Sequence, residues 1–260
     1  MLSNLAKLYS YKELLYNLAL REIKSKYKQT MIGIGWVVFQ PLVMMFVFTA
    51  VFSYFAKVRT GDVPYPLFSY CGLVVWAFFS NSVLKGMSSI ISNINLVTKT
   101  YFPREILPLS AIISSFVDFL VACLLFLLLV IFYGIPFTGY ILMVPLILII
   151  QIILVTGFSL FLSAFNVFKR DAGYVVPIAL QVWMFLSPIV YPVNLVPENY
   201  RALYMLNPVA CIVEGYRSSI LYGQMPSLRE LGWAAVVSLV ILVAAYIYFK
   251  KAEMKFADII

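Results

Sequence analysis

Histidine is absent from the 260-residue sequence, and the three cysteines stand apart from one another inside apolar segments. A zinc site requires clustered Cys and His ligands and a disulfide framework requires paired cysteines, so neither is expected. The phosphate-loop signature GxxxxGK followed by Ser or Thr does not occur, which excludes ATP hydrolysis of that kind by this chain. No HExxH pattern, paired aspartate motif or Ser–His constellation indicates an enzyme. We therefore expect no metal, cofactor or catalytic centre here.

Charged residues are also scarce, at 12% of the chain, whereas hydrophobic residues make up 63%. Soluble proteins contain about a quarter charged residues, so this composition indicates an integral membrane protein. The apolar runs leave no stretch for a separate soluble domain, and we divide the chain into a cytoplasmic interface segment, 1–32, and one membrane domain, 33–260. The first 32 residues hold six Lys and Arg and no leading apolar core, so a removable signal peptide is not expected.

Six segments are long and apolar enough to cross a membrane as helices, which takes about 20 residues each. We predict an all-α fold whose spans cover 33–56, 67–91, 107–133, 141–166, 174–191 and 229–249, the fifth being the shortest. Thirteen of the nineteen Lys and Arg residues fall on the side that holds both termini, and five fall on the other. Because Lys and Arg collect in cytoplasmic loops, both termini are predicted to be cytoplasmic. The net charge of +8 is then an orientation signal, and nucleic-acid binding is not implied.

The stretch from Tyr191 to Ser227, on the predicted outer side, is too apolar for a simple loop and too interrupted for a seventh span. The prolines at 192, 197 and 208 divide it into apolar pieces of about 10 to 14 residues, the length of re-entrant or interfacial segments. We predict two short helices that fold back over 192–227 as a lid on a pathway, because irregular backbone at that depth needs protein or water beside it. An amphipathic outer loop packed on the bundle is the alternative. Glu214 and Arg217, three residues apart, can pair on one helical face.

Residues 4–28 carry Leu and Tyr at three- and four-residue steps and basic residues on another face, which is typical of an amphipathic helix along the membrane. This helix either anchors to lipid or presents its polar face to a soluble partner, and periodicity does not decide between the two. Two further inner loops are charged, 92–110 and 166–174. Ordinary positive-inside topology accounts for both loops and is the favoured interpretation from the residues alone.

Asp118 lies well inside the third predicted span, and an intramembrane carboxylate is a functional candidate by default. Lys85 of the second span is offset from it by about 7 Å in depth, within reach of a lysine side chain. We therefore expect a buried ion pair or a pore-facing polar contact rather than a proton-carrying acid. Aromatic residues make up 17% of the chain. Most are expected to anchor at the membrane interface, and an inward-facing subset would offer flat surfaces to sugar rings.

Four blocks of the sequence together resemble the membrane subunit of type-2 ABC exporters, specifically the permeases for bacterial O-antigen, teichoic acid or capsule-like polysaccharides. The first block, LALREIKSKYKQTMIGIGWVVFQP, is similar to the basic helix of that family, which runs into Gly-x-x-Trp and a proline. The others are NLVTKTYFPREILPLS, NVFKRDAGYVVPIALQVWMFLSPIVYP and LNPVACIVEGYR. The resemblance covers nearly the whole chain.

The resemblance implies a homodimer in the bacterial inner membrane, with each copy docked on a cytoplasmic ATPase that carries ATP and Mg. The chain itself would be a transport subunit and not an enzyme. Its cargo would be a lipid-linked polysaccharide, such as O-antigen on undecaprenyl diphosphate, moved outwards through a channel. A type-2 permease for drugs or small lipids, and an ion-coupled secondary transporter centred on Asp118, remain as alternatives.

The resemblance also implies roles for individual residues. The loop between spans two and three becomes the ATPase-coupling segment, with Asn95, Lys99, Phe102, Pro103, Arg104 and Glu105. The interface helix borders the same partner through Arg21, Lys24 and Lys28. The family has a basic–acidic turn in an inner loop, and Lys169, Arg170 and Asp171 match it. Physical reasoning alone assigns no role to this turn. The outer helices act as a gate that includes Pro197, Tyr200, Asn207 and Pro208. As channel-lining aromatics for stacking against sugars we nominate Trp36, Phe39, Trp76, Phe79 and Trp183.

Overall fold

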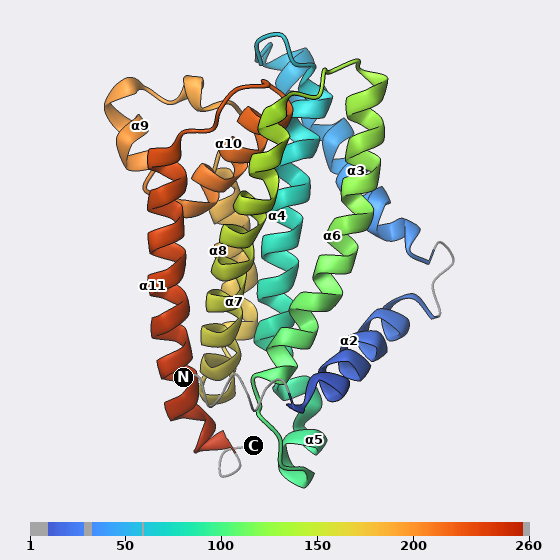
Figure 1. The fold of residues 1–260 in the computed structure, drawn as a ribbon, viewed down its shortest axis with the longest axis vertical. Helices are drawn as coiled ribbons and strands as arrows, with labels where there is room; N and C mark the ends of the chain where they lie inside the picture. Colours follow the sequence, from blue (N-terminus) through green and yellow to red (C-terminus); the bar gives the residue numbers. More distant parts are fainter. Residues whose placement is uncertain (1–9, 29–32, 59, 257–260) are drawn as a thin grey trace.

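The computed structural model of the protein describes residues 10–28, 33–58 and 60–256, and these form helices and turns without strands. Five helical stretches are long and apolar enough to cross a membrane and stand together as an upright bundle (Figure 1). They are Gly35–Phe55, Tyr65–Ser88, Ile106–Phe132, Gly139–Phe168 and Leu228–Glu253. The first consists of α3 (Gly35–Phe48) and a π-helical turn, the fourth of a 3-10 turn and α7 (Val144–Phe168), and the others are α4, α6 and α11.

The fifth predicted span is a shorter helix than the other five. α8 (Ala172–Phe185) has 14 residues, or about 21 Å at 1.5 Å per residue, against about 30 Å of hydrocarbon. Turns follow from Leu186 to the extended backbone of Pro192. Pro188 explains the early end, because the residue before a proline is disfavoured in the α-helical conformation. The six predicted spans are thus five long helices and one short apolar helix with an irregular end.

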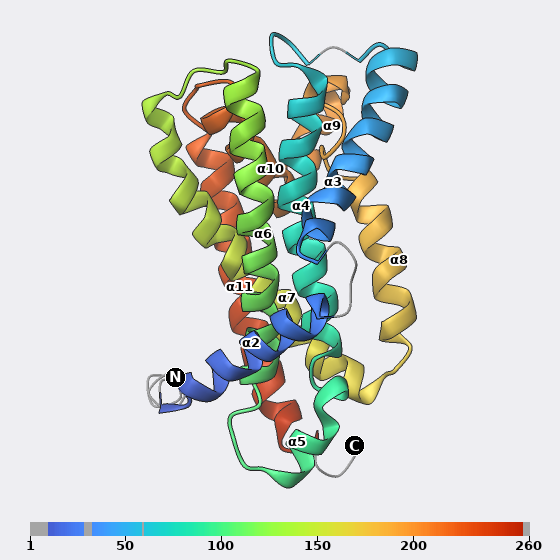
Figure 2. The same cartoon turned by 90° about the vertical axis from the view of Figure 1, so that its right-hand side faces the viewer.

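α2 (Lys12–Tyr27) is the amphipathic helix predicted near the N-terminus, and residues 4–9 of that prediction lie outside the described residues. It crosses the lower part of the bundle obliquely and packs against α6 (Figure 2). The short helix α5 (Ile94–Lys99) lies at the same end of the molecule as α2 and the last turn of α11. The helices α9 (Glu198–Tyr204) and α10 (Pro208–Ile220) lie at the opposite end.

Two apolar cores hold the bundle together. The larger surrounds α4, which packs against α3, α6, α7, α8 and α10 and buries residues along its whole length. The smaller core lies at the end that carries α2 and joins that helix to the ends of α6, α7 and α11, with Leu18, Phe102, Ile106, Ala164 and Phe249 among its buried members. The smaller core fixes the amphipathic helix α2 against the bundle, because protein covers the face of α2 that carries Leu18.

The segment predicted to fold back as two short helices does so as α9 and α10. The Asn207 side chain accepts a hydrogen bond from the backbone N–H of Val209 at 3.1 Å, and Pro208 occupies the first turn, which are favourable residues for starting a helix. Ten of the thirteen residues of α10 are buried. The helix packs against α4, α7 and α11. A simple surface loop would not be enclosed in this way.

Arg217 of α10 joins the folded-back segment to the rest of the bundle. Its side chain is fully buried, and its Nη2 atom donates to the carbonyl oxygens of Ile189 at 2.6 Å and Phe68 at 3.3 Å. Its Nη1 atom donates to the carbonyl of Pro188 and lies 2.7 Å from Glu214, so the predicted i, i+3 pair is present. The guanidinium also stacks 3.6 Å above the ring of Phe68. Arg217 therefore supplies donors to carbonyls that the irregular end of α8 leaves without helical partners.

Gly72 on α4 leaves the space that this arrangement needs. A Cβ atom there would lie 2.5 Å from the Ile189 oxygen and 2.7 Å from Arg217 Nη2. We expect Gly72→Ala to lower the free energy of unfolding by about 1 to 3 kcal/mol, because neither backbone nor buried guanidinium can move aside easily. Thermal unfolding of the purified protein in detergent measures this. Gly232→Ala on α11, where a Cβ meets nothing within 4 Å, is the matched control, and equal destabilisation by both would contradict the explanation.

Candidate functional site

The connection between α4 and α6 forms a projecting tip at the α2 end of the bundle (Figure 2). Of the six residues predicted to couple to an ATPase, Asn95 and Lys99 are exposed on α5. Tyr101, two residues after Lys99, is 95% exposed. Sequence reasoning did not single out Tyr101, although a large aromatic residue in a short polar loop was a signal that could have indicated it.

The other four predicted coupling residues are partly or fully buried: Phe102, Pro103, Arg104 and Glu105. The carboxylate of Glu105, 2% exposed, pairs with the ammonium group of Lys250 on α11. The backbone N–H of Arg104 donates to Glu253 Oε1 at 3.1 Å, and its guanidinium donates to the backbone carbonyl of Glu253. These contacts fix the base of the tip to the end of α11. Of the six predicted coupling residues, Asn95 and Lys99 are therefore exposed, and the other four form the buried or partly buried base.

The predicted interface residues Arg21, Lys24 and Lys28 are all exposed on or next to α2. Arg21 also donates a hydrogen bond to the side-chain oxygen of Asn93, immediately before α5. The neighbouring Glu22 accepts from the hydroxyl of Ser110 on α6 at 3.2 Å, and burial raises the pKa of its carboxyl above the usual value. α2 is thus linked to the tip and to the bundle.

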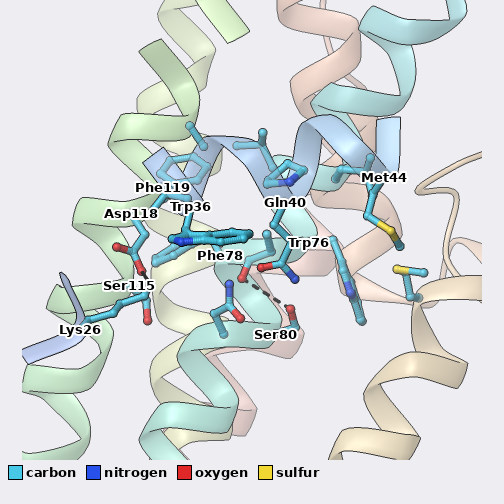
Figure 3. Close-up of a pocket in the computed structure, with 18 residues that line it drawn as sticks. Lys26, Trp36, Gln40, Met44, Trp76, Phe78, Ser80, Ser115, Asp118 and Phe119 are labelled. Atoms are coloured by element: carbon cyan, nitrogen blue, oxygen red, sulfur yellow. Dashed lines mark hydrogen bonds and ion pairs between the residues drawn. The ribbon is translucent and has the colours of Figure 1, made fainter. Parts of the chain in front are cut away.

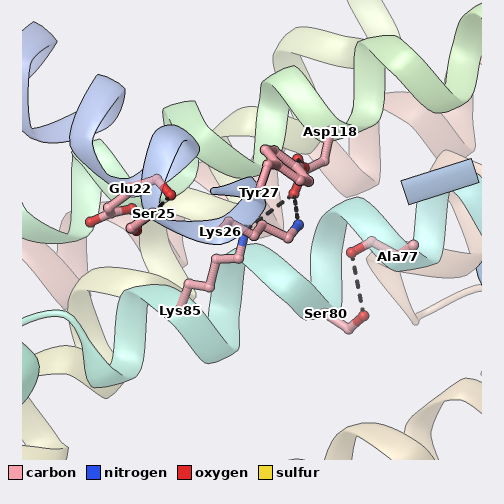
Figure 4. Close-up of polar contacts among 8 residues, drawn as sticks. All are labelled: Glu22, Ser25, Lys26, Tyr27, Ala77, Ser80, Lys85 and Asp118. Carbon is pink, nitrogen blue, oxygen red and sulfur yellow. Dashed lines mark hydrogen bonds and ion pairs between the residues drawn. The ribbon is translucent and has the colours of Figure 1, made fainter. Parts of the chain in front are cut away.

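Asp118 joins three helices. Lys85 Nζ of α4 lies 3.2 Å from its Oδ2 atom, so the pair predicted from their depth is present. Lys26 Nζ of α2 lies 2.5 Å from the same oxygen, and the hydroxyl of Tyr27 donates to Oδ1 (Figure 4). The sequence analysis missed Lys26 and Tyr27, because nothing in the linear pattern relates the end of an amphipathic helix to the middle of a span. We call Lys26, Tyr27, Lys85 and Asp118 the Asp118 junction.

A cavity of about 250 Å³ lies beside the Asp118 junction, between α3, α4 and α6. Two of the five aromatics nominated for a channel line it, Trp36 and Trp76, together with the amide side chains of Gln40 and Asn81. Lys26 and Asp118 lie on one side of the cavity and Trp76 on the other (Figure 3). The wall therefore combines aromatic faces, amides and charges, groups that suit a polar ligand with flat apolar faces such as a sugar.

The structure does not bring all five nominated aromatics to this cavity. Phe79 and Trp183 pack at 5.3 Å between ring centroids in a cluster with Phe158. Phe39 lies 5.4 Å from Trp36 in an edge-to-face arrangement and is 48% exposed. Trp76 also joins this cluster, with its ring 5.4 Å from that of Phe79 and 6.4 Å from that of Trp183. Helix rotation thus places Trp36 and Trp76 at the cavity, Phe79 and Trp183 in the packed cluster behind Trp76, and Phe39 on an exposed face.

The remaining predicted residues lie near the two ends of the molecule. The inner-turn residues Lys169, Arg170 and Asp171 are exposed between α7 and α8. In the outer segment, Pro197 and Tyr200 are exposed at α9, Pro208 is buried, and Asn207 Nδ2 donates to Ser187 Oγ at 2.7 Å. Asn207 therefore fastens the start of α10 to the irregular end of α8. Within the described residues, no group of three or more His, Cys, Asp or Glu side chains is placed to hold a metal ion.

The fold and these sites define an all-helical integral membrane protein with a projecting tip at one end and a buried, folded-back helix at the other. The chain belongs to the ABC-2 type transporter family, whose model matches residues 13–221. It is 31% identical over 97% of both chains to an O-antigen export system permease protein, RfbA, of Myxococcus xanthus. It is also 27% identical to an O-antigen export system permease protein, RfbA, of Klebsiella pneumoniae, over 95% of both chains.

A more distant relative is the polysialic acid transport protein KpsM of Escherichia coli, at 24% identity over 91% of this chain and 92% of that protein. The matches run from end to end, so they include α2, the tip and the folded-back helices together. The resemblance stated from the four sequence blocks is thereby confirmed at the level of the family.

The buried pair beneath the tip generates a stability prediction. Glu105→Gln removes the charge that faces Lys250 while keeping the side-chain shape, and we expect it to lower the free energy of unfolding by about 2 kcal/mol. Glu198→Gln is the matched control, because Glu198 is 87% exposed and lies 3.7 Å from Arg201, a pair of the exposed kind that contributes little. Thermal unfolding in detergent compares the two variants, and an unchanged midpoint for Glu105→Gln would refute the supporting role.

Proposed function

We propose that this chain is the permease subunit of an ATP-driven exporter that moves a polysaccharide across a membrane. The observation that carries the proposal is the end-to-end similarity to permeases of O-antigen export and of polysialic acid transport. Those two cargoes share their polymeric carbohydrate character. The names of these relatives do not mention drugs or small lipids, which are the alternative cargo.

The cargo we propose is a polysaccharide attached to a lipid, such as undecaprenyl-diphosphate-linked O-antigen, passing from the cytoplasm to the outer side of the bacterial inner membrane. The distribution of Lys and Arg supports this direction, because it favours a cytoplasmic location for the end that carries α2 and the tip. Aromatic and amide side chains of the 250 Å³ cavity support a carbohydrate, since a sugar ring can stack on the exposed Trp36 while Trp76, Gln40 and Asn81 complete the wall.

The energy source we propose is a separate cytoplasmic ATPase that binds ATP and Mg, with two copies serving a homodimer of this chain. The absence of a phosphate-loop signature from the sequence supports a separate ATPase. The tip supports a docking surface, with Asn95, Lys99 and Tyr101 exposed on a rigid base.

The geometry of Asp118 weighs against the ion-coupled alternative. A proton-carrying carboxylate needs a protonation state that changes during the cycle, whereas Asp118 accepts from Lys26, Lys85 and Tyr27 together. Both carboxylate oxygens of Asp118 are thus occupied by donors from α2 and α4 in the described conformation, which does not suit a group that exchanges a proton with water.

Deletion of the gene in the bacterium that encodes the chain tests the export function. We expect surface polysaccharide to disappear and lipid-linked polymer to accumulate inside the cell, because synthesis continues without an exit. Gel analysis and immunoblotting of surface and cell-internal fractions measure both. A plasmid copy of the chain restores export, and the same plasmid in cells whose partner ATPase lacks its phosphate-loop lysine does not. Unchanged surface polysaccharide in the deletion strain would refute the proposal.

Substitution of the tip tests the docking surface. We expect Tyr101→Ala to weaken binding of the ATPase by about 2 kcal/mol, as exposed aromatics at interfaces often do. The amount of ATPase that co-purifies with the membrane chain measures the effect. Tyr200→Ala is the matched control, because Tyr200 is 62% exposed at the opposite end of the molecule. Equal co-purification with both variants would contradict docking at the tip.

A further inference from the structure

A second cavity, of about 370 Å³, lies between α2, α4, the first part of α6 and the segment that precedes α5. Its described lining contains three cations, Arg21, Lys26 and Lys85, with five serines, one asparagine and one glutamate. Ala111 is the single apolar residue among them. Such a wall is unusual in a chain in which 63% of residues are hydrophobic. We call this space the cationic cavity.

The cationic cavity lies toward the end of the bundle that carries α2 and α5. Lys85 is twenty residues beyond Tyr65 and three before Ser88, the two ends of α4, so it lies about 30 Å along that helix, close to its second end. α2 crosses the bundle at this level, near the end that carries α5 (Figure 2). A lipid headgroup that enters beside α2 would therefore reach the cations from this end, without travelling the length of the bundle.

The cations of the cavity have more donors than their present partners use. Lys26 and Lys85 share one carboxylate oxygen, Asp118 Oδ2, at 2.5 and 3.2 Å (Figure 4). Each ammonium group carries three N–H donors and a guanidinium carries five, so the three cations provide more donors than their contacts with Asp118 and Asn93 use, even with the Glu22 carboxylate in the same lining. Arginine and lysine together are well suited to phosphate, which offers several charged oxygens in a compact group.

The cationic cavity adjoins the aromatic cavity described above. Lys26 lines both spaces, and Asp118 lines the aromatic one together with Trp36 and Trp76. A molecule in which a phosphate is followed by a sugar would place its phosphate near Lys26 and its first ring toward the tryptophans. The order of chemistry across the two cavities matches that of a lipid-phosphate-linked glycan.

We propose that the cationic cavity binds the phosphate-bearing head of a lipid, and that Asp118 is the anion that holds Lys26 and Lys85 when no head is bound. The phosphate oxygens then take the place of the Asp118 carboxylate as acceptors for both lysines. The inference rests on the proposed function for one source of that head, the diphosphate lipid that carries the glycan. The other source of the same chemistry is a membrane phospholipid.

Asp118 distinguishes a phosphate site from a cluster that is merely structural. If the lysines serve only to pair with Asp118, removing either side of the pair disturbs the same structure and changes ligand binding in the same direction. If a phosphate competes with Asp118, neutralising the aspartate must strengthen binding while neutralising a lysine weakens it. The amide of Asp118→Asn keeps an oxygen that accepts from Tyr27 and the lysines, and Leu18 remains buried in the smaller core, so α2 keeps its position.

The experiment uses the full chain in nanodiscs of phosphatidylcholine, without an ATPase, and follows tryptophan fluorescence during titration with undecaprenyl diphosphate. We expect Lys85→Gln to weaken binding about tenfold, the loss of one charge-assisted hydrogen bond, and Asp118→Asn to tighten it several-fold. Lys24→Gln, an exposed neutralisation on α2 that does not line the cavity, is the control with unchanged affinity. Thermal unfolding of each variant verifies that it is folded.

Undecaprenol, which has the same chain and no phosphate, and phosphatidylglycerol complete the experiment. Weak binding of undecaprenol supports phosphate recognition, and preference for undecaprenyl diphosphate over phosphatidylglycerol assigns the site to the cargo, whereas equal binding assigns it to membrane phospholipid. Binding of undecaprenol as tight as that of its diphosphate, or weakening by Asp118→Asn as large as that by Lys85→Gln, would overturn the proposal. This experiment measures binding and not transport, so its failure would not refute the export function. The gene deletion tests that function separately.

Discussion

The irregular end of the bundle depends on the hydrogen bonds that the buried guanidinium of Arg217 donates to backbone carbonyls. A membrane protein must provide hydrogen-bond partners for every backbone group within the apolar layer. α8 ends after 14 residues, and the carbonyls of Pro188 and Ile189 receive their donors from Arg217 instead of from a continued helix. The same side chain is balanced by Glu214 and by the ring of Phe68, so one residue ties α10, α8 and α4 together.

The Asp118 junction plays the corresponding role toward the other end. Here the charges come from three helices, and α2 contributes two of the four residues. A buried ion pair is weak evidence for stability but fixes geometry, because each partner must stay where its counter-charge is. α2 is therefore positioned both by the apolar contact of Leu18 and by charge. Its exposed face remains available while its inner face borders two cavities of different chemistry.

At the α2 end of the bundle, the base of the tip provides the stiffness that the proposed docking requires. Phe102 and Glu105 are buried against α11, and their immobilisation carries Lys99 and Tyr101 outward on a short helix and loop. A partner that binds the tip would thus act on α6 and α11 at once, because the buried contacts leave little freedom for independent movement. The Arg21 contact with Asn93 extends this connection to α2.

The sequence by itself determined the class of the protein, the number and approximate limits of its apolar helices, the two short outer helices and the family. The class and the helices follow from composition, run length and proline spacing, which are local properties of the chain, whereas the family follows from the resemblance of four sequence blocks to its members. It also indicated the pairs Glu214–Arg217 and Lys85–Asp118, since helical rise and spacing suffice for both. Only the tertiary structure decided that Lys26 and Tyr27 join Asp118, that Glu105 is buried while Tyr101 is exposed, and that Trp36 and Trp76 line a cavity while Phe79 is packed. Those outcomes depend on how each helix is rotated about its axis and where it meets the next, and the linear order of residues does not specify rotation.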